Sequence, residues 1–279
     1  MTSVVATNPI PTPPIDRHKI GIAGLLRSEW TKIRSVRSTV WALLILVVLA
    51  LGFTTLITAL ISAQWHKTDI SQQREILADP TRTILGAGFQ FSQLAVCVLG
   101  VLVIANEYSS GTIRASLLAV PRRTPILAAK ALVFAALVFV VGELAAFPSF
   151  FIGAAILHKH AAVSLGDPGV LRAVIGAGLY LSVLGVFAIA IGALVRHAAG
   201  GITGIIGFVL VLAPLAQLLP GSAGKHVHAY LPSEAGSLIA SPRQAADDLL
   251  SPWQGFGVFC LWTAALMLVA MYALKHRDA

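Results

Sequence analysis

Charged residues are scarce in this sequence, and their scarcity excludes an ordinary soluble globular protein. Only 11% of the 279 residues are Asp, Glu, Lys or Arg, whereas a soluble domain carries roughly 25%. Hydrophobic residues make up 57% of the chain, so too few polar side chains are present to cover a surface that faces water. The composition therefore indicates a protein that is solvated largely by lipid.

Cysteine is nearly absent, which excludes a disulfide framework and a cysteine-based metal site. The two cysteines, Cys97 and Cys260, lie in apolar runs and are expected to pack as small apolar residues. Histidines occur in two close pairs, His158 with His160 and His226 with His228. Such pairs can bind a transition metal, but no cysteine or regularly spaced carboxylate supports that role. We predict solvated loop histidines, no metal site and no cofactor in this chain.

A phosphate-binding loop is also missing. The motif G-x-x-x-x-G-K-[ST] supplies the backbone cradle for a nucleotide, and it occurs nowhere in the sequence. The nearest stretch, GSAGKHV, has Leu219 at the first glycine position and His226 in place of Ser or Thr. If this protein uses ATP, another chain must bind it.

Long apolar runs are what the sequence has in abundance. A helix needs about 20 apolar residues to cross roughly 30 Å of hydrocarbon, and six runs reach that length: 40–63, 84–105, 131–157, 173–195, 201–219 and 256–274. Lipid leaves only helices or a closed barrel to satisfy the backbone, and these runs lack the alternation of barrel strands. We predict an all-α integral membrane protein with six transmembrane helices.

Lysines and arginines are distributed unevenly between the two sides of the predicted bundle. Thirteen of the 20 fall on the side of both termini and the 106–130 loop, and seven fall on the other side. With the acidic residues included, the first side has a net charge of +9 and the second of zero. The positive-inside rule therefore predicts that both termini are cytoplasmic. Anionic lipid accounts for the basic surplus, so we expect no nucleic-acid partner.

The segment at 20–36 is predicted to form an interfacial amphipathic helix before the first span. Its apolar side chains share one arc, with basic residues opposite: Ile22, Leu25, Leu26, Trp30, Ile33 and Val36. Glu29 interrupts this arc. We expect it to pair with Lys32 and to reach the headgroups, and the alternative is a contact with an arginine of the 106–130 loop. Residues 1–19, with four prolines, are expected to form a disordered tail, followed by one membrane domain at 20–279.

Two stretches carry a resemblance to a known family. RSEWTKIRSVRSTVWAL, Arg27–Leu43, resembles the entry segment of bacterial ABC transporter permeases of the type-2 exporter class, especially those of actinobacterial type. NEYSSGTIRASLLAVPRRTPILAAK, Asn106–Lys130, resembles the loop between the second and third spans of the same family. Many relatives have Gly where this chain has Asn106. The resemblance covers about residues 20–274, because the six-span layout is similar too.

The resemblance implies a multi-pass permease of the bacterial plasma membrane that exports a substrate the family does not specify. It also implies that two permease subunits, as a homodimer or a heterodimer, dock ABC ATPase subunits that bind ATP and Mg²⁺. An elbow helix would correspond to 20–36, with these residues in it: Glu29, Trp30, Lys32 and Arg34. A coupling helix would lie in the 106–123 loop and contact the ATPase.

The 106–123 loop has local signals of a short helix as well. Gly111 and Thr112 are typical of a turn followed by a helix N-cap, and Ile113 to Val120 make two turns that end at Pro121. A helix this short needs a surface to pack on, and the resemblance makes that surface the ATPase. The candidate coupling residues are Glu107, Tyr108, Gly111, Thr112, Ile113, Arg114, Leu117, Arg122 and Arg123. Two other roles are open to Glu107 and Tyr108. They could anchor the end of the second span, or they could pair with Arg114.

Polar residues inside the spans are candidates for the substrate pathway: Gln90, Gln93, Glu143 and Pro148. A charge at the depth of Glu143 costs about 2.5–3.5 kcal/mol, so this carboxyl is expected to be protonated, paired or in contact with water. A pathway role and a hydrogen bond to Tyr180 or Gln93 are equally compatible with it. Pro148 frees a backbone carbonyl that can kink the helix. For the two glutamines we favour bonds between helices.

Two other functions are compatible with the sequence. A secondary transporter with Glu143 as proton carrier would transport without any ATPase. A membrane anchor or sensor subunit would not transport at all. An enzyme embedded in the membrane would need clustered catalytic groups, whereas the spans contain a single acid.

Overall fold

The computed structural model describes residues 21–111, 123–218, 221–245 and 248–276, and over these ranges it is helical without strands. Six helical segments of the described residues are long and apolar enough to cross a membrane, so the predicted all-α membrane fold is confirmed. They are α2 (Arg37–Ala63), α4 (Pro80–Ser109), α6 (Arg123–Leu157), α7 (Val170–Val195), the series α8 (Ala198–Ile206), η2 (Gly207–Val211) and α9 (Leu212–Gln217), and α12 (Pro252–His276). The predicted tail at 1–19 and the short helix at 113–120 lie outside the described residues.

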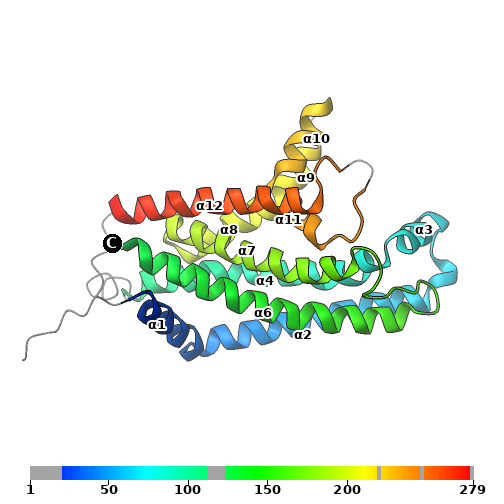
Figure 1. The fold of residues 1–279 in the computed structure, drawn as a ribbon, viewed down its shortest axis with the longest axis horizontal. Helices are drawn as coiled ribbons and strands as arrows, with labels where there is room; N and C mark the ends of the chain where they lie inside the picture. Colours follow the sequence, from blue (N-terminus) through cyan, green and yellow to red (C-terminus); the bar gives the residue numbers. More distant parts are fainter. Residues whose placement is uncertain (1–20, 112–122, 219–220, 246–247, 277–279) are drawn as a thin grey trace, which may run out of the picture.

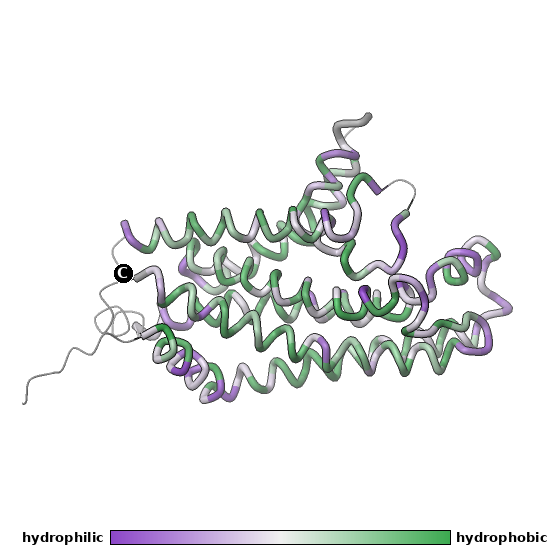
Figure 2. The backbone as a smooth tube through the Cα atoms, viewed as in Figure 1, coloured by the Kyte–Doolittle hydropathy of each residue, from purple (hydrophilic) through white to green (hydrophobic). Residues whose placement is uncertain are grey.

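The spans form a bundle around α7, which is the most buried of the six. α4 and α6 pack along α7, and α2 packs against both of them, while α8 and α12 also contact α7 (Figure 1). α7 and α8 are joined by a short turn at Arg196, so the expected pairing of the fourth and fifth spans is confirmed. Hydrophobic residues dominate along the helices, and polar ones gather toward the ends and connections (Figure 2).

Both ends of the described chain lie at the same end of the bundle (Figure 1). The helix α1 (Ile22–Ser35) lies there, packed against the first turns of α6, and α12 ends at the same end of the bundle. We call this the α1 end. The opposite end carries α3 (Ile70–Ala78) and is called the α3 end.

Glycines of α7 allow its close packing. Gly178, Gly185 and Gly192 are spaced by seven residues, which predicts a stripe where neighbouring helices approach. The structure confirms this stripe, because an added Cβ would come within 2.8 Å of the Phe134 ring at Gly185 and within 2.6 Å of the Ile104 side chain at Gly192.

Gly200, Gly204 and Gly207 fall on one face of the fifth span, which predicts a second stripe of close packing. Among the described residues, an added Cβ at Gly207 would have no neighbour within 4 Å, and one at Gly204 would only just touch Ile191. At Gly200, by contrast, an added Cβ would lie 3.0 Å from the Val195 side chain. The prediction of close packing is therefore confirmed at Gly200, whereas the face at Gly204 and Gly207 is open among the described residues.

The α3 end is more helical than the sequence suggests. Besides α3, the structure has η1 (Trp65–Lys67), α10 (Gly221–Tyr230) and α11 (Pro232–Ser237), none of which was predicted. The sequence of the last connection between spans predicts two helical pieces, Leu238–Ala240 and Gln244–Leu250, and the first is present as the 3₁₀ turn η3. The other expected piece, Gln244–Leu250, is not helical in its described residues, where the Asp248 side chain instead accepts a hydrogen bond from the Ala245 N–H.

Candidate functional site

A cluster of four charged side chains, two of them buried, ties three helices together at the α1 end. α1 supplies Glu29 and Lys32, α4 supplies Glu107 near its end, and α6 supplies Lys130. Lys130 Nζ lies 2.5 Å from Glu29 Oε2 and 2.8 Å from Glu107 Oε1. Lys32 Nζ lies 2.7 Å from Glu29 Oε1 and 3.3 Å from Glu107 Oε1. These four residues are called the charge cluster.

Two members of the charge cluster are almost fully removed from solvent. Glu29 and Lys130 are each 2% exposed, and a charge in that environment is tolerated only when it is paired. Two carboxylates and two ammonium groups balance each other, so the cluster is formally neutral. It therefore fixes the position of α1 against the ends of α4 and α6 that flank residues 112–122.

The ion pairs shift the pKa values of the two cluster residues on α1, Glu29 and Lys32. Burial by itself raises the pKa of Glu29, but the charge of Lys130 and the hydrogen bonds from Lys130 and Lys32 bring the pKa below its ordinary value. Burial by itself lowers the pKa of Lys32, but the hydrogen bond to Glu29 and the charges of Glu107 and Glu29 bring the pKa above its ordinary value. Both groups are thus held in their charged forms.

These shifts predict how stability depends on pH. A carboxyl whose pKa is lower in the folded state stabilises the protein above its unfolded pKa, here 4.5, and this stabilisation is lost as pH falls through the folded pKa. Lys32, whose pKa is higher in the folded state, stabilises the folded protein below its unfolded pKa of 10.5. This stabilisation is lost as pH rises through the raised, folded-state pKa. We expect the melting temperature of the detergent-solubilised protein to be level between these values and to fall on the acid side. Glu29→Gln should weaken that acid-side fall, and an unchanged fall in this variant would contradict the assignment.

The charge cluster corrects one sequence prediction and confirms another. The expected pair between Glu29 and Lys32 is present. Glu29 does not reach the headgroups, however, because it is buried, and its second partner is Lys130 rather than an arginine. Glu107 forms an ion pair with Lys130 and so anchors the end of the second span. This is one of the two other roles that the sequence left open for Glu107.

Tyr108 makes a separate contact with the turn between α7 and α8. The Arg196 guanidinium carbon lies 5.3 Å from the centre of the Tyr108 ring. Arg196 itself adopts a left-handed conformation, with φ 59°, at the end of α7. Gly111 also has positive φ, 71°, which fits the turn predicted after the second span.

Several predicted coupling residues lie outside the described residues, namely Thr112, Ile113, Arg114, Leu117 and Arg122. Arg123 begins α6. Of the predicted coupling residues, Glu107 therefore belongs to the charge cluster. The contact between the loop and an ATPase stays a prediction.

A polar cavity opens between helices at the α3 end. Its deeper part has a volume of about 340 Å³, and both Gln90 and Gln93 line it, with Arg82 and Glu234. A second part of about 540 Å³ shares Arg82 and Glu234 with the first and extends along α10. From Arg82 to Gln93 the cavity follows α4 for roughly 16 Å at 1.5 Å per residue. The predicted pathway residues Gln90 and Gln93 therefore face a cavity that leads from one end of the bundle toward its middle.

One aromatic residue of the cavity lining, Phe89, begins a series of ring contacts that continues into the core of the bundle. The Tyr180 hydroxyl donates a hydrogen bond of 2.9 Å to Gln93 Oε1, so the expectation that Gln93 bonds between helices is also confirmed. Ring-to-ring contacts then run from Phe89 through Tyr180, Phe259 and Phe187 to Phe208, with centroid distances between 5.0 and 6.0 Å. We call these five rings the aromatic layer.

The fifth span departs from regular helix beside the same cavity. η2 is a π-helical turn, and Val209 and Leu210 within it line the cavity. Such turns are rare and frequent at functional sites. No sequence signal other than Gly207 and the following Pro214 pointed to it.

Glu143 and Pro148 do not line this cavity. Both carboxyl oxygens of Glu143 are buried and have no hydrogen-bond partner among the described residues, and an added Cβ at Gly178 would collide with Oε1. The alternative of a hydrogen bond from Glu143 to Tyr180 or Gln93 is therefore wrong. Tyr180 and Gln93 bond to each other instead. Pro148 lies inside α6, which continues past it to Leu157.

A family model described as an ABC-2 family transporter protein matches residues 25–214. The match is more than half of the chain and includes most of α1 and the residues that line the deeper part of the polar cavity up to Pro214. A search of curated proteins finds no match. Among the described residues, no group of three or more His, Cys, Asp or Glu side chains is placed to hold a metal ion.

Proposed function

Because the chain belongs to the ABC-2 family of transporter proteins, we propose that it is the permease subunit of an ATP-driven exporter. The permease spans the membrane, forms the substrate pathway and takes its energy from a separate ABC ATPase that binds ATP and Mg²⁺. The two sequence motifs support the type-2 exporter class, and they resemble those of the actinobacterial type. This chain supplies no catalytic residue to ATP hydrolysis.

The charge cluster is the observation that supports coupling. It joins α1 to the ends of α4 and α6, and residues 112–122 connect these two ends. A force applied to that segment is therefore transmitted to three helices together rather than to a flexible loop. In this proposal α1 is the elbow helix, and Trp30 and Arg34 lie on its membrane side.

The orientation follows from the charge count. The α1 end faces the cytoplasm of a bacterial cell, because thirteen of the 20 basic residues belong to that side. The polar cavity then faces the outside, and the substrate leaves through it after passing the aromatic layer. A second permease, identical or similar, completes the pathway, and the open glycine face of α8 is available for such a contact.

Variants of the coupling segment test this proposal. We expect Arg114→Glu and Leu117→Ala to reduce co-purification of the cognate ABC ATPase and to abolish ATP-dependent export, because the short helix that the sequence predicts here would bind through few side chains. Arg74→Glu is a matched control, since Arg74 is exposed on α3 at the opposite end. Undiminished co-purification and export in both coupling variants would contradict docking at this segment.

One observation favours a second candidate, a proton-driven transporter. The Glu143 carboxyl is buried without a partner among the described residues, as a proton carrier would be. That function requires transport that persists without the ATPase and stops in Glu143→Gln. ATP-dependent export that survives Glu143→Gln would exclude it, and export without any ATPase would exclude the permease function instead.

A further inference from the structure

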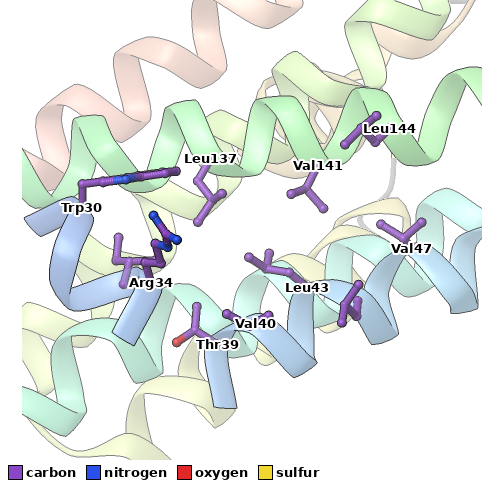
Figure 3. A pocket seen from close by; sticks show the side chains of 11 residues that line it. Trp30, Arg34, Thr39, Val40, Leu43, Val47, Leu137, Val141 and Leu144 are labelled. Carbon is purple, nitrogen blue, oxygen red and sulfur yellow. The ribbon is translucent and has the colours of Figure 1, made fainter. Parts of the chain in front are cut away.

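An apolar groove runs along the outer face of the bundle between α1, α2 and α6. It has a volume of about 280 Å³. Trp30 and Arg34 of α1 stand at one end of it, and Val47 and Leu144 at the other (Figure 3). The groove does not join the polar cavity, since the two share no lining residue.

The lining of the groove suits a hydrocarbon chain. α2 and α6 supply only aliphatic side chains apart from Thr39: Val40, Leu43, Leu44, Val47, Leu137, Val141 and Leu144. Several of these remain strongly exposed, Leu44 by 52% and Leu144 by 60%. From Val40 to Val47 the groove extends about 10 Å along α2. A polar solute finds no hydrogen-bonding group along this length, whereas an acyl chain needs none.

The α1 end of the groove carries a cation that the charge cluster does not use. Arg34 is exposed and lines the groove, and it makes no hydrogen bond or ion pair with any described residue. Lys32, two positions earlier, points instead to Glu29 and Glu107. A guanidinium is a strong bidentate partner for phosphate. Trp30 beside it is half-exposed, as expected of an aromatic residue at the level of lipid headgroups.

We propose that this groove binds one anionic phospholipid of the leaflet at the α1 end. One acyl chain lies between α2 and α6, and the phosphate contacts Arg34. The bound lipid fills the space beneath α1, so it braces the helix that carries Glu29 and Lys32. The proposal requires only that the chain lies in a bilayer, and it does not depend on coupling to an ATPase.

Fluorescence quenching of Trp30 by brominated lipid tests the site. The full-length protein is placed in nanodiscs of phosphatidylcholine with a small share of dibrominated phosphatidylglycerol or dibrominated phosphatidylcholine. Subtracting the signal of Trp30→Phe isolates the contribution of Trp30 from the other four tryptophans. We expect the anionic lipid to be preferred about fivefold, the ratio that one basic residue near the membrane surface provides.

Two pairs of variants separate the headgroup from the chain. Arg34→Gln should abolish the preference for phosphatidylglycerol, while Arg27→Gln should keep it, because Arg27 lies two turns earlier on α1 and does not line the groove. Val141→Phe should fill the groove and reduce quenching by both lipids. Val140→Phe is its control, since Val140 is exposed on α6 but is not part of the lining.

Three results would overturn the proposal. Equal loss of preference in Arg34→Gln and Arg27→Gln would mean that only the general surface charge attracts lipid. Unchanged quenching in Val141→Phe would mean that no chain enters the groove. Absence of Trp30 quenching together with cross-linking of Leu44→Cys between two copies would mean that a second permease covers it.

Discussion

Lys130→Met is expected to destabilise the protein more than any other single change in the charge cluster. The ammonium group is 2% exposed and contacts both Glu29 and Glu107. Its removal leaves two carboxylates facing Lys32 alone, so the buried cluster acquires a net negative charge. Breaking a buried ion pair in this way costs about 3–5 kcal/mol, a large share of the 5–15 kcal/mol typical of folded proteins.

The double variant Glu29→Gln with Lys130→Met tests whether charge balance is the cause. It leaves Lys32 and Glu107 as one neutral pair, so it should recover most of the lost melting temperature, measured in detergent by size-exclusion chromatography after heating. Lys275→Met removes an exposed lysine at the end of α12 and should change stability by less than about 0.5 kcal/mol. A double variant no more stable than Lys130→Met would refute this account of the cluster.

Gly100→Ala is expected to have the second-largest effect, through packing rather than charge. A Cβ at this position of α4 would lie 2.5 Å from Ala188 Cβ and 2.8 Å from the Gly185 carbonyl oxygen, both on α7. Neither atom can rotate away, so the two helices must separate. Forced overpacking costs typically 1–3 kcal/mol, and we expect the upper part of that range here because the contact lies between two central spans.

Gly86→Ala is the matched control for this prediction. Gly86 lies on the same helix, and among the described residues an added Cβ would have no neighbour within 4 Å. Alanine is favoured over glycine in helices by about 1 kcal/mol, so this variant should be neutral or slightly stabilising. Equal melting temperatures for Gly100→Ala and Gly86→Ala would show that α4 and α7 do not need their close approach.

The membrane spans could be predicted from sequence because lipid imposes a single constraint on them. Every backbone group must be paired inside the segment, so a long apolar run defines a helix whatever its neighbours are. The structure accordingly shifts most ends of the predicted runs by a few residues, as from 84–105 to Pro80–Ser109. The largest difference is at α6, which begins at Arg123 rather than at residue 131. The helices α3 and α10 were missed because they contain many polar residues and lack this constraint.

The charge cluster could be predicted only in part. The position of Glu29 on an apolar arc marked it as unusual, and its pair with Lys32 follows from helix geometry. Lys130 is 101 residues further along the chain, and only the packing of α1 against α6 brings it close. Long-range pairing of this kind has no local pattern. For the same reason, neither the polar cavity nor the apolar groove could be inferred from the sequence, because each is lined by residues of several helices that are far apart in the chain.

The aromatic layer also limits how far the polar cavity reaches. Of its five rings only Phe89 lines the cavity, and the single hydroxyl among them, that of Tyr180, already donates its hydrogen bond to Gln93. The rings beyond Phe89 contact one another and offer no further hydrogen-bonding group. In the conformation described here, a polar solute that moved from the cavity toward these rings would therefore have to displace aromatic contacts rather than exchange hydrogen bonds.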